Sequence, residues 1–304
     1  MASNNSLPVR KVNDKLIFVQ VLVSCFLFIN LLLITTFFMN DFFYTIMRYI
    51  LFTTMLLSDC LFLILADALL VLNSLHIVIQ MWLCLTMYIF LSLNTFVTPV
   101  TLTAMTLERY VAICMPLRHG ELCSTLSAVR WIYIIHGLSF VPCFVTLSTF
   151  FASASHTFYT QRRLCSVEIF ILYRWQGYLR SAISQLYFLI MCIIIFFSYN
   201  GIMKVAKAAS GEDKKSTQKG LRTVTLHAFQ LFLCLIHMWC PFIENAVMQI
   251  NFLVYVNLRY FNYVTFILLP RCLSPLIYGL RDKMFFQALK HYALCGLYKK
   301  HIAY

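Results

Sequence analysis

The sequence predicts an all-α membrane protein: a seven-transmembrane helix bundle with a short amphipathic helix near its C terminus. Composition is the first observation, since 61% of the 304 residues are hydrophobic and 12% are charged, against about 25% charged in soluble domains. The second is that the apolar residues form blocks about as long as the ~20 residues that a helix needs to cross the hydrocarbon core. The third is that lysine and arginine gather in alternate connections, as they do in multi-pass proteins.

These apolar blocks give the expected elements in order. We expect membrane helices at about 16–39, 48–72, 80–112, 126–151, 180–203, 219–247 and 254–278, and an amphipathic helix at about 281–295. The connections are short, so residues 1–304 form one domain, with a polar linker from Ser210 to Lys219. The first block starts too late to follow a short charged leader, so we expect it to be retained rather than cleaved.

The distribution of lysine and arginine predicts the orientation. Cytoplasmic loops retain these residues, and most of them lie in connections on the side of the C terminus. The basic residues within 10–15 argue the other way, whereas the glycosylation sequon at Asn4, completed by Ser6, favours an outer N terminus. We expect a plasma-membrane protein with an extracellular N terminus and a cytoplasmic C terminus.

The formal charge of +13 does not indicate a nucleic-acid partner. Basic residues at the inner ends of membrane helices bind anionic lipid head groups. Membrane lipids therefore account for this charge, and no nucleic-acid partner is expected.

Ionisable side chains inside the spans need a reason, since each costs about 2.5 to 3.5 kcal/mol on insertion scales. Asp59 lies halfway along its helix among apolar residues and must face the bundle interior. Asn30 and Ser274, also near mid-span, can form a polar cluster with it, and a sodium ion could join them. The alternative is a protonated aspartic acid bonded to a backbone carbonyl.

Glu108 and Arg109 lie about one turn before the third helix leaves the membrane. An arginine at this depth can exchange partners when other helices move, which makes it a candidate two-state switch. The alternative is an arginine whose side chain extends to lipid phosphates.

Two of the twelve cysteines lie outside the apolar interior of the spans. Cys84 opens the third helix, and Cys165 lies in the longest outer connection. Both face the oxidising side, so a bridge between them could hold that connection over the mouth of the bundle.

An ordered set of motifs covers nearly the whole chain. Asn30 and Asp59 come first, Cys84 lies 25 residues before Arg109, and MTLERYVAICMPLRH leads out of the third helix; Ser198 and Tyr199 end the fifth, KGLRTVTLH opens the sixth with Lys219, Thr223 and His227, and SPLIYGLRD closes the seventh with Pro275 and Tyr278. On these motifs the chain resembles rhodopsin-like (class A) G-protein-coupled receptors and, within them, odorant receptors of the fish-type branch. It departs from that pattern at Ser274, where the family usually has Asn, at Val224, where it usually has Cys, and at the charged Arg271.

The resemblance implies roles for several residues. It favours the Cys84–Cys165 disulfide, and it implies that Arg109 holds the resting state through Glu108. The implied switch and coupling residues are Glu108, Arg109, Tyr110, Tyr199, Thr223, His227, Pro275 and Tyr278. The implied partner is a heterotrimeric G protein, of the stimulatory olfactory type.

Helical geometry predicts where a ligand would bind. Whole turns counted back from Arg109 place Thr98, Thr95 and Leu91 on one inward face, the last two roughly 20 to 27 Å above Arg109. Similar counts on the sixth and seventh helices give Cys234, Met238 and Leu268. Leu91 and Leu268 stand where amine receptors carry an aspartate and opsins the retinal lysine, so an amine and a covalent retinal are both disfavoured.

The predicted lining is apolar with hydroxyl groups, which suits a small organic odorant. Asp67 and Arg271 could instead face the cavity and select charged, water-borne ligands, and both alternatives stay open. Thr95 and Thr98 are also compatible with ordinary hydrogen bonding between helices.

Other functions are compatible with the composition. A class A receptor for a peptide or lipid is one, and a transporter or channel is another, although no repeat symmetry supports the latter. No metal-ligand spacing and no nucleophile–base set indicates an enzyme. We expect no cofactor beyond the candidate sodium ion.

Overall fold

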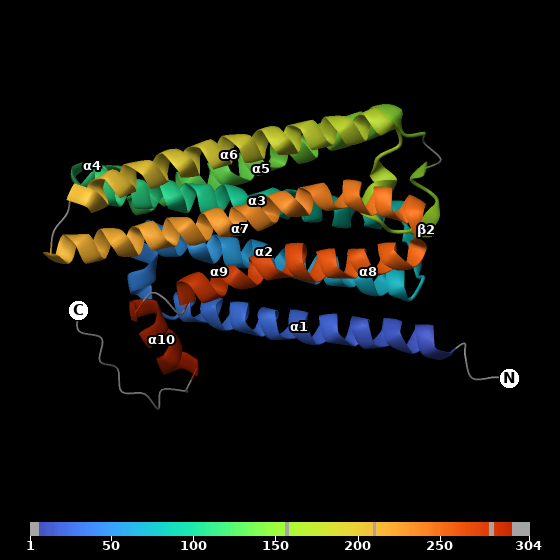
Figure 1. Cartoon of the computed structure of the whole chain (residues 1–304), viewed down its shortest axis with the longest axis horizontal. Helices are drawn as coiled ribbons and strands as arrows, with labels where there is room; N and C mark the ends of the chain where they lie inside the picture. Colours follow the sequence, from blue (N-terminus) through green and yellow to red (C-terminus); the bar gives the residue numbers. More distant parts are fainter. Residues whose placement is uncertain (1–5, 156–157, 209–210, 280–282, 294–304) are drawn as a thin grey trace.

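A computed structural model describes residues 6–155, 158–208, 211–279 and 283–293, and its long helices lie side by side along one axis (Figure 1). In chain order the elements are α1 (Ser6–Phe38), η1 (Asp41–Thr45), α2 (Met47–Ser74), β1 (Val78–Gln80), α3 (Met81–Cys114), α4 (Pro116–Leu122), α5 (Thr125–Ser153), β2 (Arg162–Leu164), η3 (Val167–Phe170), α6 (Arg174–Ala208), α7 (Gly211–Ile250), α8 (Phe252–Asn262), η4 (Tyr263–Leu268), α9 (Leu269–Gly279) and α10 (Lys283–Ala293).

Seven of the described helical segments are long and apolar enough to cross a membrane, and α10 follows them as a short C-terminal helix. Large apolar side chains point outward from these segments, for example Phe28 (63% exposed) and Phe196 (69% exposed). Such exposure is unfavourable in water and favourable in lipid, where the helices also satisfy their own backbone polar groups. The predicted fold class is confirmed.

The two ends of the bundle differ (Figure 1). The end with α4 and α10 is called the α10 end here, and the end with β1 and β2 the disulfide end. β1 and β2 pair antiparallel, with Val78 opposite Leu164 and Gln80 opposite Arg162. The sequence analysis predicted no strands, because each has three residues and no recognisable alternation.

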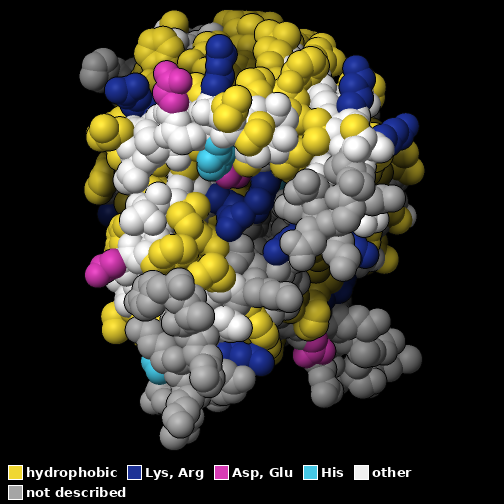
Figure 2. All heavy atoms as spheres, turned by 90° about the vertical axis from the view of Figure 1, so that its left-hand side faces the viewer, with side chains coloured by type: hydrophobic (Ala, Val, Ile, Leu, Met, Phe, Trp, Pro, Cys, Tyr) yellow, Lys and Arg dark blue, Asp and Glu magenta, His cyan; other side chains and the backbone are white. Residues whose placement is uncertain are grey.

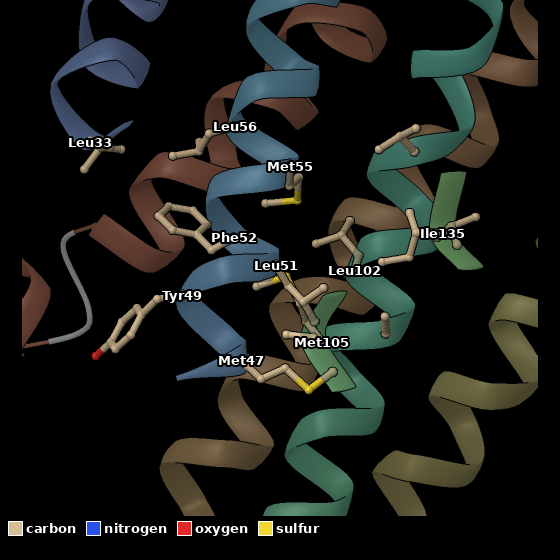
Figure 3. Close-up of a cluster of buried hydrophobic side chains, with 14 of the residues drawn as sticks. Leu33, Met47, Tyr49, Leu51, Phe52, Met55, Leu56, Leu102, Met105 and Ile135 are labelled. Carbon is tan, nitrogen blue, oxygen red and sulfur yellow. The ribbon is translucent and has the colours of Figure 1, made fainter. Parts of the chain in front are cut away.

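A buried apolar cluster holds the helices together towards the α10 end (Figure 3). Leu51, Met55 and Leu56 of α2 are completely buried, and Leu102 and Met105 of α3 are equally inaccessible. These side chains are closely packed, so the loss of even one methylene group would lower the stability of the bundle. The cluster fixes α2 against α3 directly below the polar residues described next.

Several helices differ from the expected ones; α1 begins at Ser6 and α6 at Arg174, both earlier than predicted. The stretch expected as a polar linker is helical from Gly211 onwards and forms the start of α7, because Glu, Lys and Gln are good helix formers. The seventh span combines α8, a π-helical turn η4 and α9. Pro270 follows this turn and lacks the N–H that a regular helix would use, and π-turns of this kind are frequent at functional sites.

Candidate functional site

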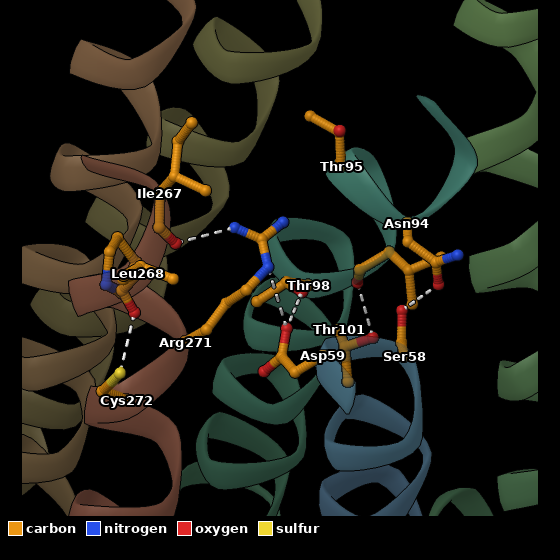
Figure 4. A network of polar contacts seen from close by, with 12 residues as sticks. Ser58, Asp59, Asn94, Thr95, Thr98, Thr101, Ile267, Leu268, Arg271 and Cys272 are labelled. Atoms are coloured by element: carbon orange, nitrogen blue, oxygen red, sulfur yellow. Dashed lines mark hydrogen bonds and ion pairs between the residues drawn. The ribbon is translucent and has the colours of Figure 1, made fainter. Parts of the chain in front are cut away.

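A buried ion pair lies in the middle of the bundle (Figure 4). Nε of Arg271 in α9 lies 3.6 Å from Oδ1 of Asp59 in α2, and the two side chains are 5% and 0% exposed. Oγ1 of Thr98 in α3 donates a hydrogen bond of 2.7 Å to the same carboxylate oxygen. Three helices therefore meet at one carboxylate.

The two charged groups lie close together, but some of their polar atoms have no hydrogen-bond partner among the described residues. Nη1 of Arg271 donates to the carbonyl oxygen of Ile267 at 3.0 Å, and the guanidinium carbon lies 3.3 Å from the ring centroid of Phe62. Among the described residues, Nε of Arg271 and Oδ2 of Asp59 make no hydrogen bond. A buried charge pair of this kind has polar atoms left over for another partner.

The cluster around Asp59 has other members than the sequence analysis expected. Asn30 is completely buried in α1 but makes no hydrogen bond to Asp59 within the described part of the chain, and the side chain of Ser274 lies outside the described residues. Ser58 and Asn94 form a separate hydrogen bond beside it.

These residues do not fit a sodium ion. The guanidinium of Arg271 already lies against the carboxylate that would bind the metal, and a second cation there would be repelled. Arg271 is thus a built-in cation at this position.

A small cavity adjoins the ion pair. Among the predicted ligand residues, Thr95, Thr98, Cys234 and Met238 line it. Arg271, which the sequence left open as a contact for charged ligands, also lines the cavity, and Phe188, His237, Phe266 and Pro270, which were not predicted, complete the lining. The cavity has room for about one water-sized group, so a larger ligand enters only if lining side chains move.

The other two predicted ligand residues lie elsewhere. Leu91 packs in an apolar cluster near the disulfide end, and Leu268 packs against Val19 and Val23 of α1. Leu268 ends the π-turn η4 and packs against α1 rather than facing the cavity. Asp67 does not line the cavity either, because it accepts a hydrogen bond of 2.6 Å from Gln20.

A charged cluster lies at the α10 end of α3. Nε of Arg109 is 3.8 Å from Oε2 of Glu108, and Nε2 of His119 in α4 is 3.6 Å from the other oxygen. Cys123 follows α4, and burial, together with the nearby negative charge of Glu108, raises the pKa of its thiol to about 11. Figure 2 views the α10 end and shows basic side chains in a central depression with a histidine at its edge.

The other predicted switch residues lie between α3, α6 and α7. Oγ1 of Thr106 is 3.0 Å from Nδ1 of His227, and both are completely buried. Tyr110 packs against Phe197, and a Cβ on Gly201 would collide with the Tyr110 ring, so α3 and α6 approach closely here.

The remaining predicted switch residues lie on α6, α7 and α9. Tyr199 is half-buried beside the apolar cluster, Thr223 bonds back to Lys219, and Pro275 is buried in α9. The side chain of Tyr278 and all of Asn4 lie outside the described residues.

The Cys84–Cys165 disulfide is present, with Cα atoms 5.6 Å apart. Nδ2 of Asn73 donates to the carbonyl oxygen of Cys165 at 2.9 Å and ties the same loop to α2. The strand pair places this loop across the disulfide end of α3.

The pairing of Asp59 with Arg271 is the feature that the sequence analysis did not predict. Both residues stood out as costly charges in apolar helices. Two opposite charges at a similar depth in the membrane could have indicated the pair. The sequence analysis instead interpreted Arg271 as a departure from the family pattern or as a contact for a charged ligand.

Comparisons with known proteins agree on one family. Residues 29–278 match the model of the 7 transmembrane receptor (rhodopsin family). The chain is 39% identical over 300 residues to Odorant receptor 131-2 of Danio rerio, covering 98% of this chain and 92% of that protein. It is 27% identical over 221 residues to Olfactory receptor 4K2 of Homo sapiens, covering 66% and 62%.

Proposed function

The chain belongs to the rhodopsin family of seven-transmembrane receptors and to the odorant receptors within it, and from this premise we propose that it binds a small organic odorant and activates a heterotrimeric G protein. The family is one of receptors, so the chain is neither an enzyme nor a transporter. The chemical class of the odorant, the residues that bind it and the olfactory stimulatory type of G protein are part of the proposal.

The cavity beside Arg271 carries the ligand part of this proposal. Its lining combines aromatic and sulfur-containing side chains, such as Phe188 and Met238, with the polar groups of Thr95 and Arg271. This mixture suits a small ligand held by shape and one or two hydrogen bonds. Any ligand larger than a water molecule must displace lining side chains, and a small odorant would displace fewer of them than a peptide, which supports an odorant over a peptide.

The α10 end carries the coupling part. The basic side chains there (Figure 2) support both a cytoplasmic location and a surface for the G protein. Arg109 is 21% exposed, so it is partly accessible from this end while still held beside Glu108. Ligand binding would shift the receptor to a state in which Arg109 leaves Glu108, by its differential affinity for the two states.

The orientation follows from the same features. Disulfides form on the oxidising, extracellular side of the membrane, and this supports a cytoplasmic location for the α10 end. We propose a plasma-membrane location on this basis.

The test is a cAMP assay in cells that express the chain, with pools of carboxylates, amines, alcohols, aldehydes, amino acids, bile acids and peptides. The proposal expects a concentration-dependent rise in cAMP with at least one pool of small organic compounds. A response to peptides alone would contradict the odorant assignment, and a ligand-gated current from purified protein in liposomes would contradict G-protein signalling.

A further inference from the structure

We propose that the cavity selects small monocarboxylates and that Arg271 recognises their carboxylate group; this rests on the proposed function, since the cavity is the same site. The reasons are the charge of the lining, the hydrogen-bonding capacity left on Arg271, and the apolar wall opposite it.

The lining has one fixed charge, and it is positive. Arg271 is the fixed cation, and the other described lining residues include no carboxylate. Asp59 neutralises Arg271 only from below the cavity, at 3.6 Å and without a hydrogen bond from Nε. An ammonium ligand would be repelled by the guanidinium of Arg271 and would find no carboxylate in the described lining to pair with. A carboxylate ligand would instead accept a charge-assisted hydrogen bond from Arg271.

The two threonine hydroxyls of the lining have no proton left to donate to a ligand. Oγ1 of Thr95 already donates to the carbonyl oxygen of Leu91, and that of Thr98 donates to Asp59. Nδ1 of His237 is buried and makes no hydrogen bond among the described residues. Arg271, and His237 in the tautomer that carries a proton on Nδ1, are therefore the groups on this cavity that can donate to a ligand oxygen.

The rest of the lining is largely apolar, and part of it can move to make room for a ligand. Phe188, Phe266 and Pro270 offer rigid apolar surface, and Met238, with its flexible unbranched side chain, is the residue that most readily moves aside. A carboxylate on a short hydrocarbon tail matches this arrangement, with its charged group on Arg271 and its tail among the aromatic rings.

Binding can be tested on the full-length receptor purified in lipid nanodiscs. Thermal unfolding is followed at neutral pH with straight-chain carboxylates and with the alcohols and amines of the same chain lengths. Three variants are compared: Asp59→Asn, the double variant Asp59→Asn/Arg271→Gln, and Arg259→Gln as a control. Arg259 is bonded to Tyr255 in α8 and does not line the cavity.

Carboxylates should stabilise the wild-type receptor and the control, and amines should not. Asp59→Asn should bind carboxylates more tightly, because the competing negative charge is gone. The double variant, which leaves no unpaired charge behind, should bind at least about tenfold more weakly than the wild type, equivalent to about 1.4 kcal/mol.

Three outcomes would overturn the inference: no stabilisation by any carboxylate, equal stabilisation by amines, or unchanged carboxylate binding in the double variant. Failure of the proposed function is recognised separately. Carboxylate binding without any cAMP response contradicts that function alone, whereas cAMP responses to neutral or cationic odorants without carboxylate binding contradict this inference alone.

Discussion

The guanidinium of Arg271 lies 3.6 Å from the carboxylate of Asp59, and both side chains are buried in the membrane-spanning part of the bundle. This pair joins α9 to α2, while Thr98 links the same carboxylate to α3. One buried carboxylate thus connects three helices and lies next to the cavity that Arg271 lines. The pair affects ion binding and stability, and each effect can be measured.

Sodium should have no specific effect on this receptor. Because Arg271 supplies the positive charge at Asp59, replacing potassium chloride by sodium chloride at equal ionic strength should leave the unfolding temperature of the purified protein unchanged. In Arg271→Ser the charge is removed and space is freed, so sodium should raise the unfolding temperature by mass action. Stabilisation of the wild type by sodium over potassium would contradict the assignment of Arg271 as a built-in cation.

Loss of one partner of the ion pair should be more damaging than loss of both. Asp59→Asn leaves Arg271 buried without its counter-charge, which typically costs about 3–5 kcal/mol. In Asp59→Asn/Arg271→Gln no unpaired charge remains, so part of that loss should be recovered. The wild type, Asp59→Asn, Arg271→Gln and the double variant form a double-mutant cycle, and simple additivity of their changes in stability, measured by thermal unfolding, would show that the two residues do not interact.

The disulfide should be required for folding and surface expression. Cys84→Ser or Cys165→Ser removes a bridge that closes 81 residues of sequence, a loss of about 2–4 kcal/mol. Either variant should lower surface expression, as measured by flow cytometry of an N-terminal tag. Cys192→Ser is the matched control, because Cys192 is a free, exposed cysteine in α6; equal expression of all three variants would argue against a structural role for the bridge.

Arg109→Ala should abolish ligand-driven cAMP production while leaving membrane insertion intact. The reason is that Arg109 is proposed to change partners on activation, and alanine can bind neither Glu108 nor the groups that replace it. Arg130→Ala is the control, since Arg130 is exposed on α5. Surface expression separates misfolding from loss of signalling, and a surface-expressed Arg109→Ala receptor with a full response would exclude the switch role.

Much of the fold could be predicted from the sequence, because the apolar blocks have the length that a bilayer demands. The first and last residues of the helices were harder to predict. The residues before Lys219 are polar, so hydropathy starts the predicted helix too late, whereas their helix propensity lets α7 begin at Gly211.

The site was predicted in part, for a related reason. Regular turns counted from Arg109 and His227 lead to Thr95, Thr98, Cys234 and Met238, which line one cavity. The count fails for Leu268, which packs against α1, because the side of the seventh span that faces α1 is set by the packing of the helices and not by the periodicity of one helix. The partners of Asp59 depend on how three helices pack, and no single-helix pattern contains that information.

In the proposed receptor, Glu108 restrains Arg109 until the G protein is activated. Nucleotide exchange on a purified stimulatory G protein, catalysed by purified receptor in nanodiscs without ligand, tests this restraint most directly. Glu108→Gln keeps the size of the side chain but removes the charge that lies 3.8 Å from Arg109, so it should raise the basal exchange rate by up to about fivefold, equivalent to about 1 kcal/mol, and adding Arg109→Ala should abolish that rise. If Glu108→Gln leaves exchange at the rate of the G protein alone, the account is contradicted.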